Sequence, residues 1–341
     1  MAYFLYPLRI LVGKLETTPG TMETLTDADF DIRIRNPEVT PTIELDDEAS
    51  RWARGDHAED DVITGAQSGQ ITFSVRMTKG TTSNTAPSWW KFANGCGLQS
   101  VNYTGKGYAL QPRKAYDETT MTLWVMDIKR GANPTAIAYK FAGGMGNMVM
   151  TADGVGKPWM ANFTFTGKLS SIATITNADI LEKIIADTAC AEKFINNDAL
   201  LGIHSHKISS FSLDIGNEIS PVIDQSDPSG YAFYGVTGRK PRLTMNPLMD
   251  SSHMIYNDII NGTTGCPTFY AGMVGSTGSD ASHFSLHIPK AQIITANMGN
   301  REGLVSQELT IKCLGNGWTG AVSDKDLDPE VTWELLQGKR S

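Results

Sequence analysis

The chain has 341 residues, a formal net charge of −8, 33 glycines and 19% charged side chains. The acidic balance argues against tight binding of DNA or RNA, which needs a basic surface, and no apolar run reaches the roughly 18 residues that cross a bilayer. The length exceeds the usual single-domain size of about 100 to 150 residues, which predicts two domains. Many short Thr/Ser/Val/Phe alternations predict a mainly β fold.

The cysteines Cys96, Cys190, Cys266 and Cys313 are far apart and form no CxxC or histidine-spaced pair, so a zinc site is not predicted. We expect buried free thiols in a reducing compartment. The first 13 residues are apolar, but they lack a basic leader and are interrupted by a proline and an arginine, so we expect no signal peptide. The protein is therefore expected to be made in a cytoplasm.

The first predicted strand covers residues 30–35, where apolar and charged side chains alternate as they do in a half-buried strand. A proline-punctuated segment then leads into an acidic loop at residues 44–61, which is too charged to lie in a core. A second alternating strand at residues 71–77 follows. Together these segments predict an extended β-hairpin with a long acidic tip.

A short helix is predicted next, at residues 87–94, because proline is favoured at the start of a helix. Strands are predicted at residues 121–128, 136–141 and 163–169. Residues 177–201 carry an apolar stripe at helical spacing, and we expect them to form an ordered helical linker.

The second half repeats the hairpin pattern. Residues 211–215 alternate, the following loop carries Glu218, Asp224 and Asp227, and a strand is predicted near residue 242. The acidic tip is therefore present in both halves.

A capped helix is predicted at residues 250–261. Strands are predicted at residues 284–288, 292–295 and 307–314, in the same order as the strands of the first half.

Further landmarks recur in the same order in both halves. They are VITG at 62–65 and GVTG at 235–238, the Gly-Cys pairs at 95–96 and 265–266, and the Thr-Ala pairs at 151–152 and 295–296. We therefore expect a mainly β protein (α+β minor) with two tandem β-sandwich or barrel domains, each flanked by a short helix. The first domain is expected at residues 1–176, the linker at 177–201 and the second domain at 202–341. Repeated modules suggest a building block, because they stack or form rings by reusing one interface.

Motifs that would carry enzyme or cofactor chemistry fail on context. The segment 315–320 matches GxGxxG but opens no helix of a βαβ unit, as a dinucleotide site requires. The alternating acids of residues 324–330 lack the glycine and the last oxygen ligand of an EF-hand loop, which favours a solvated turn.

The histidine pairs, His204 with His206 and His283 with His287, lack a third ligand nearby in the sequence. No GxSxG motif or locally activated cysteine is present. We therefore expect no enzyme activity, no catalytic residue, no cofactor and no metal.

Several segments together resemble the tail tube (major tail) proteins of long-tailed bacteriophages. These segments are LVGKLETTPGTMETLTDADFDIRIRNPEVTP, the later VITGAQSGQITFSVRM, and KISSFSLDIGNEISPVIDQSDPSGYAFYGVTGRKPRLTMNPLM in the second half. The similarity covers most of the chain in order and spacing. It rests on "K-E-T-T-P-G", "I-R-I-R-N-P" and "Y-x-V-T-G-R-x-P" patterns rather than on catalytic motifs.

The resemblance implies β-sandwich domains whose sheets join around a ring. With two domains per chain it implies a homotrimeric ring with pseudo-sixfold symmetry, stacked into a tube in the virion tail after assembly in the host cytoplasm. The implied partners are other copies of this chain, a tape measure protein, a tail terminator and distal tail or baseplate proteins. Duplex DNA would pass through without specific binding, and no membrane insertion is implied.

The acidic tips match the family's long loop, which implies contacts between subunits and rings. The candidate contact residues are Glu44, Asp46, Asp47, Glu48, Arg51, Arg54, Asp56, Glu59, Asp60, Asp61, Glu218, Asp224, Asp227, Arg239, Lys240 and Arg242. The alternative, in which both tips are only solvated, stays open.

An acidic inner wall would repel a DNA duplex and keep its passage fast, because phosphate is bound by lysine and arginine. Two other functions are weighed against the conduit. A tandem β-sandwich adhesin or carbohydrate-binding module is the main alternative, although Trp89 and Trp90 lie in a predicted helix rather than on loops that would stack sugars. A hydrolase on a β scaffold would need a nucleophile or metal set that the sequence does not present.

Overall fold

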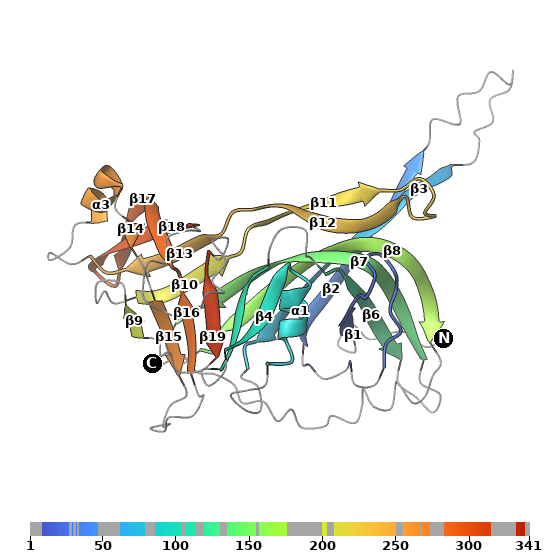
Figure 1. The fold of residues 1–341 in the computed structure, drawn as a ribbon, viewed down its shortest axis with the longest axis horizontal. Coiled ribbons are helices and arrows are strands. Elements are labelled where there is room, and N and C mark those ends of the chain that lie inside the picture. The colour runs from blue at the N-terminus through green and yellow to red at the C-terminus, as the bar shows by residue number, and fades with distance from the viewer. Residues whose placement is uncertain are drawn as a thin grey trace, which may run out of the picture.

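The structure is a computed structural model of the chain, and it describes residues 9–26, 29, 32, 34–46, 62–78, 86–103, 107–113, 119–129, 135–154, 157–175, 200–202, 208–249, 255–262, 264–265, 268–272, 283–314 and 332–337. Over these residues the fold is mainly β with antiparallel sheets and two short helices, which confirms the predicted fold class. An 11-stranded sheet runs along the whole molecule, and a 6-stranded sheet packs against it (Figure 1).

In the first half, four neighbouring strands of the large sheet follow the order β2-β3-β8-β7. They are β2 (Ile34–Asp46), β3 (Ile63–Arg76), β8 (Met160–Ile175) and β7 (Thr135–Ala152). The first part of β7 also pairs with β6 (Met121–Lys129), and β6 pairs with β1 (Arg9–Leu15). Period-2 burial along β3 places Ile71, Phe73 and Val75 in the core.

The second half repeats this strand order. Its four strands are β10 (Ile208–Asp214), β13 (Arg242–Pro247), β18 (Leu304–Leu314) and β17 (Lys290–Arg301). They are neighbours in the order β10-β13-β18-β17, and β14 (Thr264–Gly265) adds to β17. The predicted repeat is therefore present as a repeated sheet topology.

The smaller sheet also combines strands of both halves. Its order is β4-β5-β19-β16-β15-β9, with β4 (Leu98–Tyr103), β5 (Gly107–Pro112), β19 (Glu334–Gln337), β16 (His283–His287), β15 (Thr268–Gly272) and β9 (Leu200–Gly202). One hydrophobic core runs between the two sheets and draws residues from both halves of the chain. The division into domains at residues 176 and 202 stays a prediction.

The core of the first half is built around aromatic rings. Phe73 of β3 stacks on Phe163 of β8 with ring centroids 5.1 Å apart, and it meets Phe92 edge-on at 4.9 Å. Phe92 lies in helix α1 (Trp90–Asn94), which buries one face in this cluster. Such ring pairs add about 0.5–1.5 kcal/mol each beyond the area that they bury.

Several elements differ in extent from the sequence prediction. The proline-punctuated segment after residue 35, expected to lead into a loop, is part of strand β2, which continues to Asp46. Its prolines are tolerated because β2 lies at the end of the sheet path, where a strand needs only one hydrogen-bonded neighbour. The helix predicted at 87–94 begins at Trp90, and helix α3 (Ile255–Asn261) begins after the predicted residue 250.

The loop expected between the second pair of hairpin strands is itself a hairpin. It consists of β11 (Asn217–Ile223) and β12 (Tyr231–Arg239), which pair only with each other in the described part of the chain. The predicted linker helix lies outside the described residues, apart from residues 200 and 201 in β9. None of the described helices is long and apolar enough to span a membrane.

Candidate assembly interface

In the large sheet the two halves are joined by one pair of antiparallel strands, β7 and β10. Phe211, Ser212, Leu213 and Asp214 of β10 lie opposite Ala152, Thr151, Met150 and Val149 of β7. The last strand of the first four-strand set thus meets the first strand of the second set. This contact uses different surfaces of the two repeats, so it is a head-to-tail contact rather than a two-fold one.

The strand registers allow the strands of the two halves to be aligned residue by residue; this alignment is called the shared frame. Phe73 pairs with Phe163 in the first half, and Met245 pairs with Leu309 in the second. The alignment extends to the next strands. Two residues before Phe163 in β8, Ala161 pairs with Met150 of β7. Two residues before Leu309 in β18, Gln307 pairs with Met298 of β17. Met298 of β17 therefore occupies the position that Met150 has in β7.

The first strands of the two sets correspond in the same way. Val39 pairs with Ile71, and Leu213 pairs with Leu243. Both first strands also carry a β-bulge near this level, between Arg35 and Glu38 in β2 and between Ile208 and Phe211 in β10. The bulge of β2 lies opposite Phe73, and that of β10 lies opposite Asn246, one position further along than the counterpart of Phe73.

The alignment shows that the two Thr-Ala pairs, which recur in the sequence, are not at equivalent positions. In it, Thr295 corresponds to Asn147 rather than to Thr151, because Thr295 pairs with Thr310 and Asn147 pairs with Thr164. The two Thr-Ala pairs therefore lie at different levels of their strands. In contrast, residues 63–65 of the VITG segment and the whole GVTG segment lie on the returning strand of a hairpin, in β3 and β12.

Burial separates the two halves at equivalent positions. Met150 and Trp159 are each 1% exposed, because β10 covers this edge of the first half, and the Trp159 ring meets the Phe211 ring edge-on at 4.8 Å. Their counterparts in the second half are Met298, 63% exposed, and Val305, 50% exposed. Within the described part of the chain, β18 is the only strand that pairs with residues 297–300 of β17.

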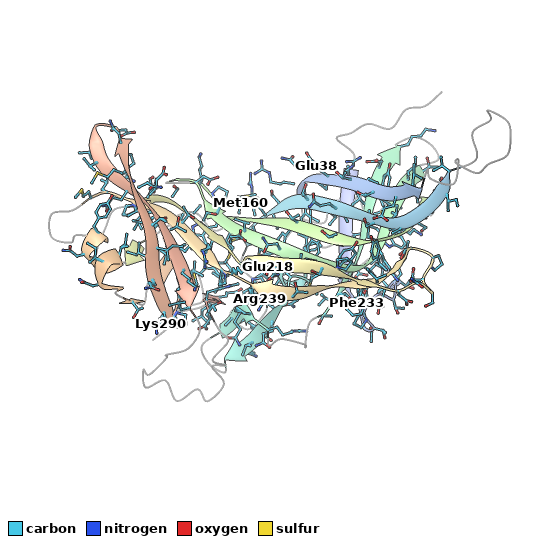
Figure 2. The ribbon with its side chains drawn as sticks, turned by 90° about the horizontal axis from the view of Figure 1, so that it is seen from above. Glu38, Met160, Glu218, Phe233, Arg239 and Lys290 are labelled. Carbon is cyan, nitrogen blue, oxygen red and sulfur yellow. The ribbon has the colours of Figure 1, made fainter. Side chains whose placement is uncertain are left out.

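The hairpin β11–β12, here called the second arm, reaches back over the first half and crosses β7 and β8 (Figure 1). Figure 2 shows Phe233 of the second arm far from Lys290, the first residue of β17. Two glycines let the arm approach closely. Gly143 has a φ of 60°, and a Cβ there would lie 2.8 Å from the Cα of Phe233. Gly20 has a φ of 78°, and a Cβ there would lie 2.2 Å from the carbonyl oxygen of Ala232.

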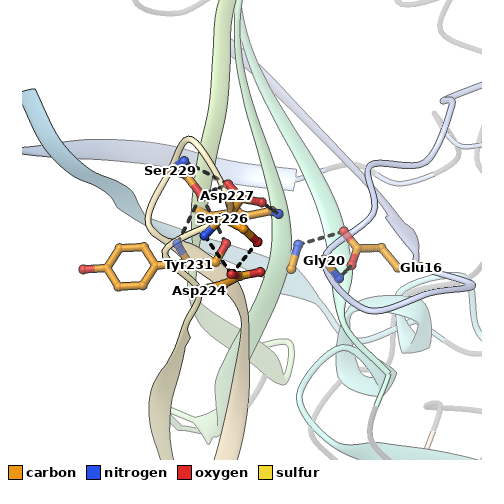
Figure 3. Close-up of polar contacts among 9 residues, drawn as sticks. Glu16, Gly20, Asp224, Ser226, Asp227, Ser229 and Tyr231 are labelled. Atoms are coloured by element: carbon orange, nitrogen blue, oxygen red, sulfur yellow. Dashed lines mark hydrogen bonds and ion pairs between the residues drawn. The ribbon is translucent and has the colours of Figure 1, made fainter.

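The buried side chain of Glu16 connects the segments of the first half that lie under the second arm. Glu16 is 3% exposed. Its side chain accepts a hydrogen bond from the backbone N–H of Gly20 at 2.8 Å (Figure 3). It also accepts from the backbone N–H of Gly143 at 2.8 Å and from the hydroxyls of Thr120 and Thr122 at 2.5 and 2.9 Å. One side chain thus ties together both glycines on which the arm rests. Such a group is costly to bury unless its oxygens are fully hydrogen-bonded.

The turn of the second arm is fastened to the first half by an ion pair. Lys168 Nζ donates to Asp227 Oδ2 at 2.7 Å, and Asp227 also accepts from the N–H and hydroxyl of Ser229 at 2.8 and 2.6 Å (Figure 3). Partial burial would raise the pKa of Asp227, but the hydrogen bonds from Lys168 and Ser229 outweigh it and lower the pKa to about 2. Hydrogen bonds from Ser226 likewise lower the pKa of Asp224.

The base of the second arm is bound to the first half by polar side chains. Asn217 donates to the carbonyl oxygens of Cys96 and Gly146, both at 2.8 Å. Arg239 donates to Asn217 Oδ1 at 2.9 Å and to the Gly97 carbonyl at 2.9 Å. These contacts join the arm to the turn after α1 and to β7.

The predicted contact residues occupy different parts of this arrangement. Asp224 and Asp227 shape the turn of the second arm, and Arg239 holds its base. Lys240 forms an exposed ion pair with Glu218, and Arg242 lies in β13. The remaining predicted residues belong to the first hairpin. Glu44 and Asp46 lie in β2, and Asp47, Glu48, Arg51, Arg54, Asp56, Glu59, Asp60 and Asp61 lie outside the described residues.

The distal part of the first hairpin, residues 42–46 and 62–68, is called the first arm. It corresponds to the second arm, because each arm emerges between the first two strands of its set. Its apolar side chains are open to solvent: Ile43 is 45% exposed, Leu45 65% and Ile63 58%. Its inner end touches the second arm of the same chain, where the N–H of Gln67 donates to the carbonyl of Ser229 at 3.0 Å.

The cysteines and histidines named in the sequence analysis are only partly within the described residues. No group of three or more His, Cys, Asp or Glu side chains in this part of the chain is placed to hold a metal ion. Cys96 and Cys313 are buried free thiols, as predicted, and burial raises the pKa of Cys313 to about 12. His283 and His287 lie in strand β16, as the pattern predicted, whereas His204 and His206 lie outside the described residues.

Sequence reasoning placed the contacts in the charged tips and missed the apolar junction. Met150 and Leu213 look like ordinary core residues in sequence. The signal that could have identified the junction is the alignment of the two repeats, because it places Met150 and Met298 at equivalent positions. Neither a scan of protein-family models nor a search of curated proteins found a match to this chain.

Proposed function

We propose that this protein is a structural subunit that polymerises head to tail with copies of itself, and that the polymer is the tail tube of a long-tailed bacteriophage. The observation that carries self-assembly is the β7–β10 junction. It joins two equivalent strand sets by unlike edges, and it leaves one edge of each kind. These are β2 at one end of the sheet and, near the other end, the part of β17 beyond Ala291 and Gln292, which pair with β14. A contact of this kind continues from chain to chain until it closes a ring or extends a helix.

Exposed apolar side chains support the proposal. Met298, Leu304 and Val305 lie at the edge of the second half, and Ile43, Leu45 and Ile63 lie on the first arm, all at least 45% exposed. Long exposed apolar strand edges promote association of chains, and monomeric proteins usually block them with charges or cover them. A subunit that is covered by its neighbours has no need of such protection.

The assignment to a tail tube comes from the sequence resemblance and from what the fold is compatible with. Two equivalent units per chain fit a homotrimeric ring with six similar units. The net charge of −8 fits a conduit that does not hold DNA, because phosphates bind to surfaces rich in lysine and arginine. The proposed partners are further rings of the same chain, a tape measure protein, a tail terminator and distal tail proteins, with the virion tail as the site of action.

Negative-stain electron microscopy of the purified chain over a range of concentrations tests this proposal. We expect rings or tubes with a central hole once the concentration exceeds a threshold. A chain that remains a monodisperse monomer in light scattering at every concentration, and that binds glycans, would instead be a tandem binding module. A strongly basic inner wall in a cryo-EM map of the tubes would contradict the conduit.

A further inference from the structure

The internal junction specifies which residues should meet when two chains join. We propose that strand β17 of one chain pairs antiparallel with strand β2 of the next, with Met298 opposite Val39, so that one sheet continues across the chain boundary in the register of β7 and β10. This inference rests on the proposed self-assembly and adds the surface and the register of the contact.

The register follows from the shared frame. At the internal junction, Met150 lies opposite Leu213. Met298 corresponds to Met150, and Val39 corresponds to Leu213, as their pairings with β18 and β3 show. Copying the junction therefore sets Met298 against Val39 of the neighbour, and each further step along one strand is matched by a step back along the other.

The two strand edges cannot satisfy each other within one chain. β2 is the last strand of the sheet path and β17 is next to the other end, where β14 pairs with it, and β18, β13, β10, β7, β8 and β3 separate the two. Figure 2 shows the separation, with Glu38 of β2 along one long side of the first half and Lys290 of β17 near the other end of the molecule. A second copy of the chain is the partner that supplies the missing edge to each.

Side chains on the two edges complement each other in the inferred register. Met298 is 63% exposed and would be covered as Met150 is covered. The copied register applies to residues 297–300 of β17, which correspond to residues 149–152 of β7. Beyond them, β-bulges between Ile293 and Thr295 and between Arg35 and Glu38 shift the pairing. An apolar pair across antiparallel strands contributes about 0.2–1 kcal/mol.

Cysteine cross-linking tests the register. The double variant Met298→Cys/Val39→Cys is treated with a mild oxidant or a short bis-maleimide under assembly conditions, and covalent dimers and higher oligomers are expected on denaturing gels. The matched out-of-register control is Met298→Cys/Ile43→Cys, whose second cysteine lies four residues from the inferred partner, about 13 Å along the strand. The single variants show what the native thiols contribute.

The internal junction supplies a positive control. Thr151→Cys/Ser212→Cys places two cysteines directly opposite each other in the known register, so it should give an intrachain cross-link with the same reagents. Particles that assemble but cross-link through 298 and 43, or through neither pair, would overturn the register while leaving self-assembly intact. A chain that never assembles would overturn the proposed function together with the register.

Discussion

The two halves of this molecule use one strand order and differ in what covers it. In the first half, β10 pairs with the edge of β7 and the second arm lies over β7 and β8. In the second half, the corresponding positions, Met298 of β17 and Val305 of β18, are exposed. One edge is therefore covered within the chain and the equivalent edge is exposed to solvent, and under the proposed assembly the exposed edge is the one that a second copy would cover.

A substitution at the exposed edge of β17 should have the largest effect on assembly. Met298→Lys should abolish assembly or raise the concentration at which it begins by at least about tenfold, because a charge would have to be buried in the new strand pair. The folded monomer should keep its stability, since the side chain is already exposed. The control is Ile260→Lys in α3, at an 80% exposed position, and assembly equal to that of the unmodified chain is expected for it. Equal loss in both variants would contradict a role for the β17 edge.

The covered half can be disturbed at the glycine under the second arm. Gly20→Ala should lower the free energy of unfolding by about 2–4 kcal/mol, because the new Cβ would meet the Ala232 carbonyl. Gly303→Ala is the matched control: its φ of 86° is similar to the 78° of Gly20, but no atom lies within 4 Å of the added Cβ. It should cost about 1 kcal/mol. Chemical denaturation measures both, and equal losses would show that the arm is not held there.

A substitution of the buried Glu16 tests whether its hydrogen bonds support the surface under the second arm. Glu16→Gln should cost about 2 kcal/mol, because the amide NH₂ would face donors such as the Gly143 N–H that the carboxylate now accepts. Glu308→Gln, at an exposed position of β18, should leave the midpoint of urea unfolding unchanged. If the Glu16 variant unfolds like its control, the proposed support of the arm by this network is wrong.

The smallest expected effect concerns the ion pair at the turn of the second arm. Lys168→Met should cost about 1 kcal/mol, whereas Lys240→Met removes a pair that is exposed on both sides and should cost less. Because the pKa of Asp227 is lowered from 3.8 to about 2 in the folded protein, its stabilisation is complete above about pH 4 and is lost as the pH falls toward 2. The difference between wild type and Lys168→Met should therefore shrink over that range in urea titrations. A difference independent of pH would rule out the ion pair as its source.

The mainly β class, the repeated order of segments and most strand positions follow from the amino-acid sequence alone. Alternating residues such as Ile71, Phe73 and Val75 reveal a buried strand face without any knowledge of neighbours, because side chains of a strand point alternately to two sides. The repeat was visible for the same reason, since equivalent strands keep equivalent patterns. The two buried thiols followed from their isolation in the sequence.

Only the tertiary structure decided which strands are neighbours and which apolar residues are covered. Met150 and Met298 are the same residue type at equivalent positions, yet one is 1% exposed and the other 63%. The difference arises from β10, which lies about sixty residues further along the chain than Met150. The extent of β2 through the proline-punctuated segment after residue 35 likewise depends on its place at the end of the sheet path, because the cost of a missing N–H depends on whether a strand has a partner on that side.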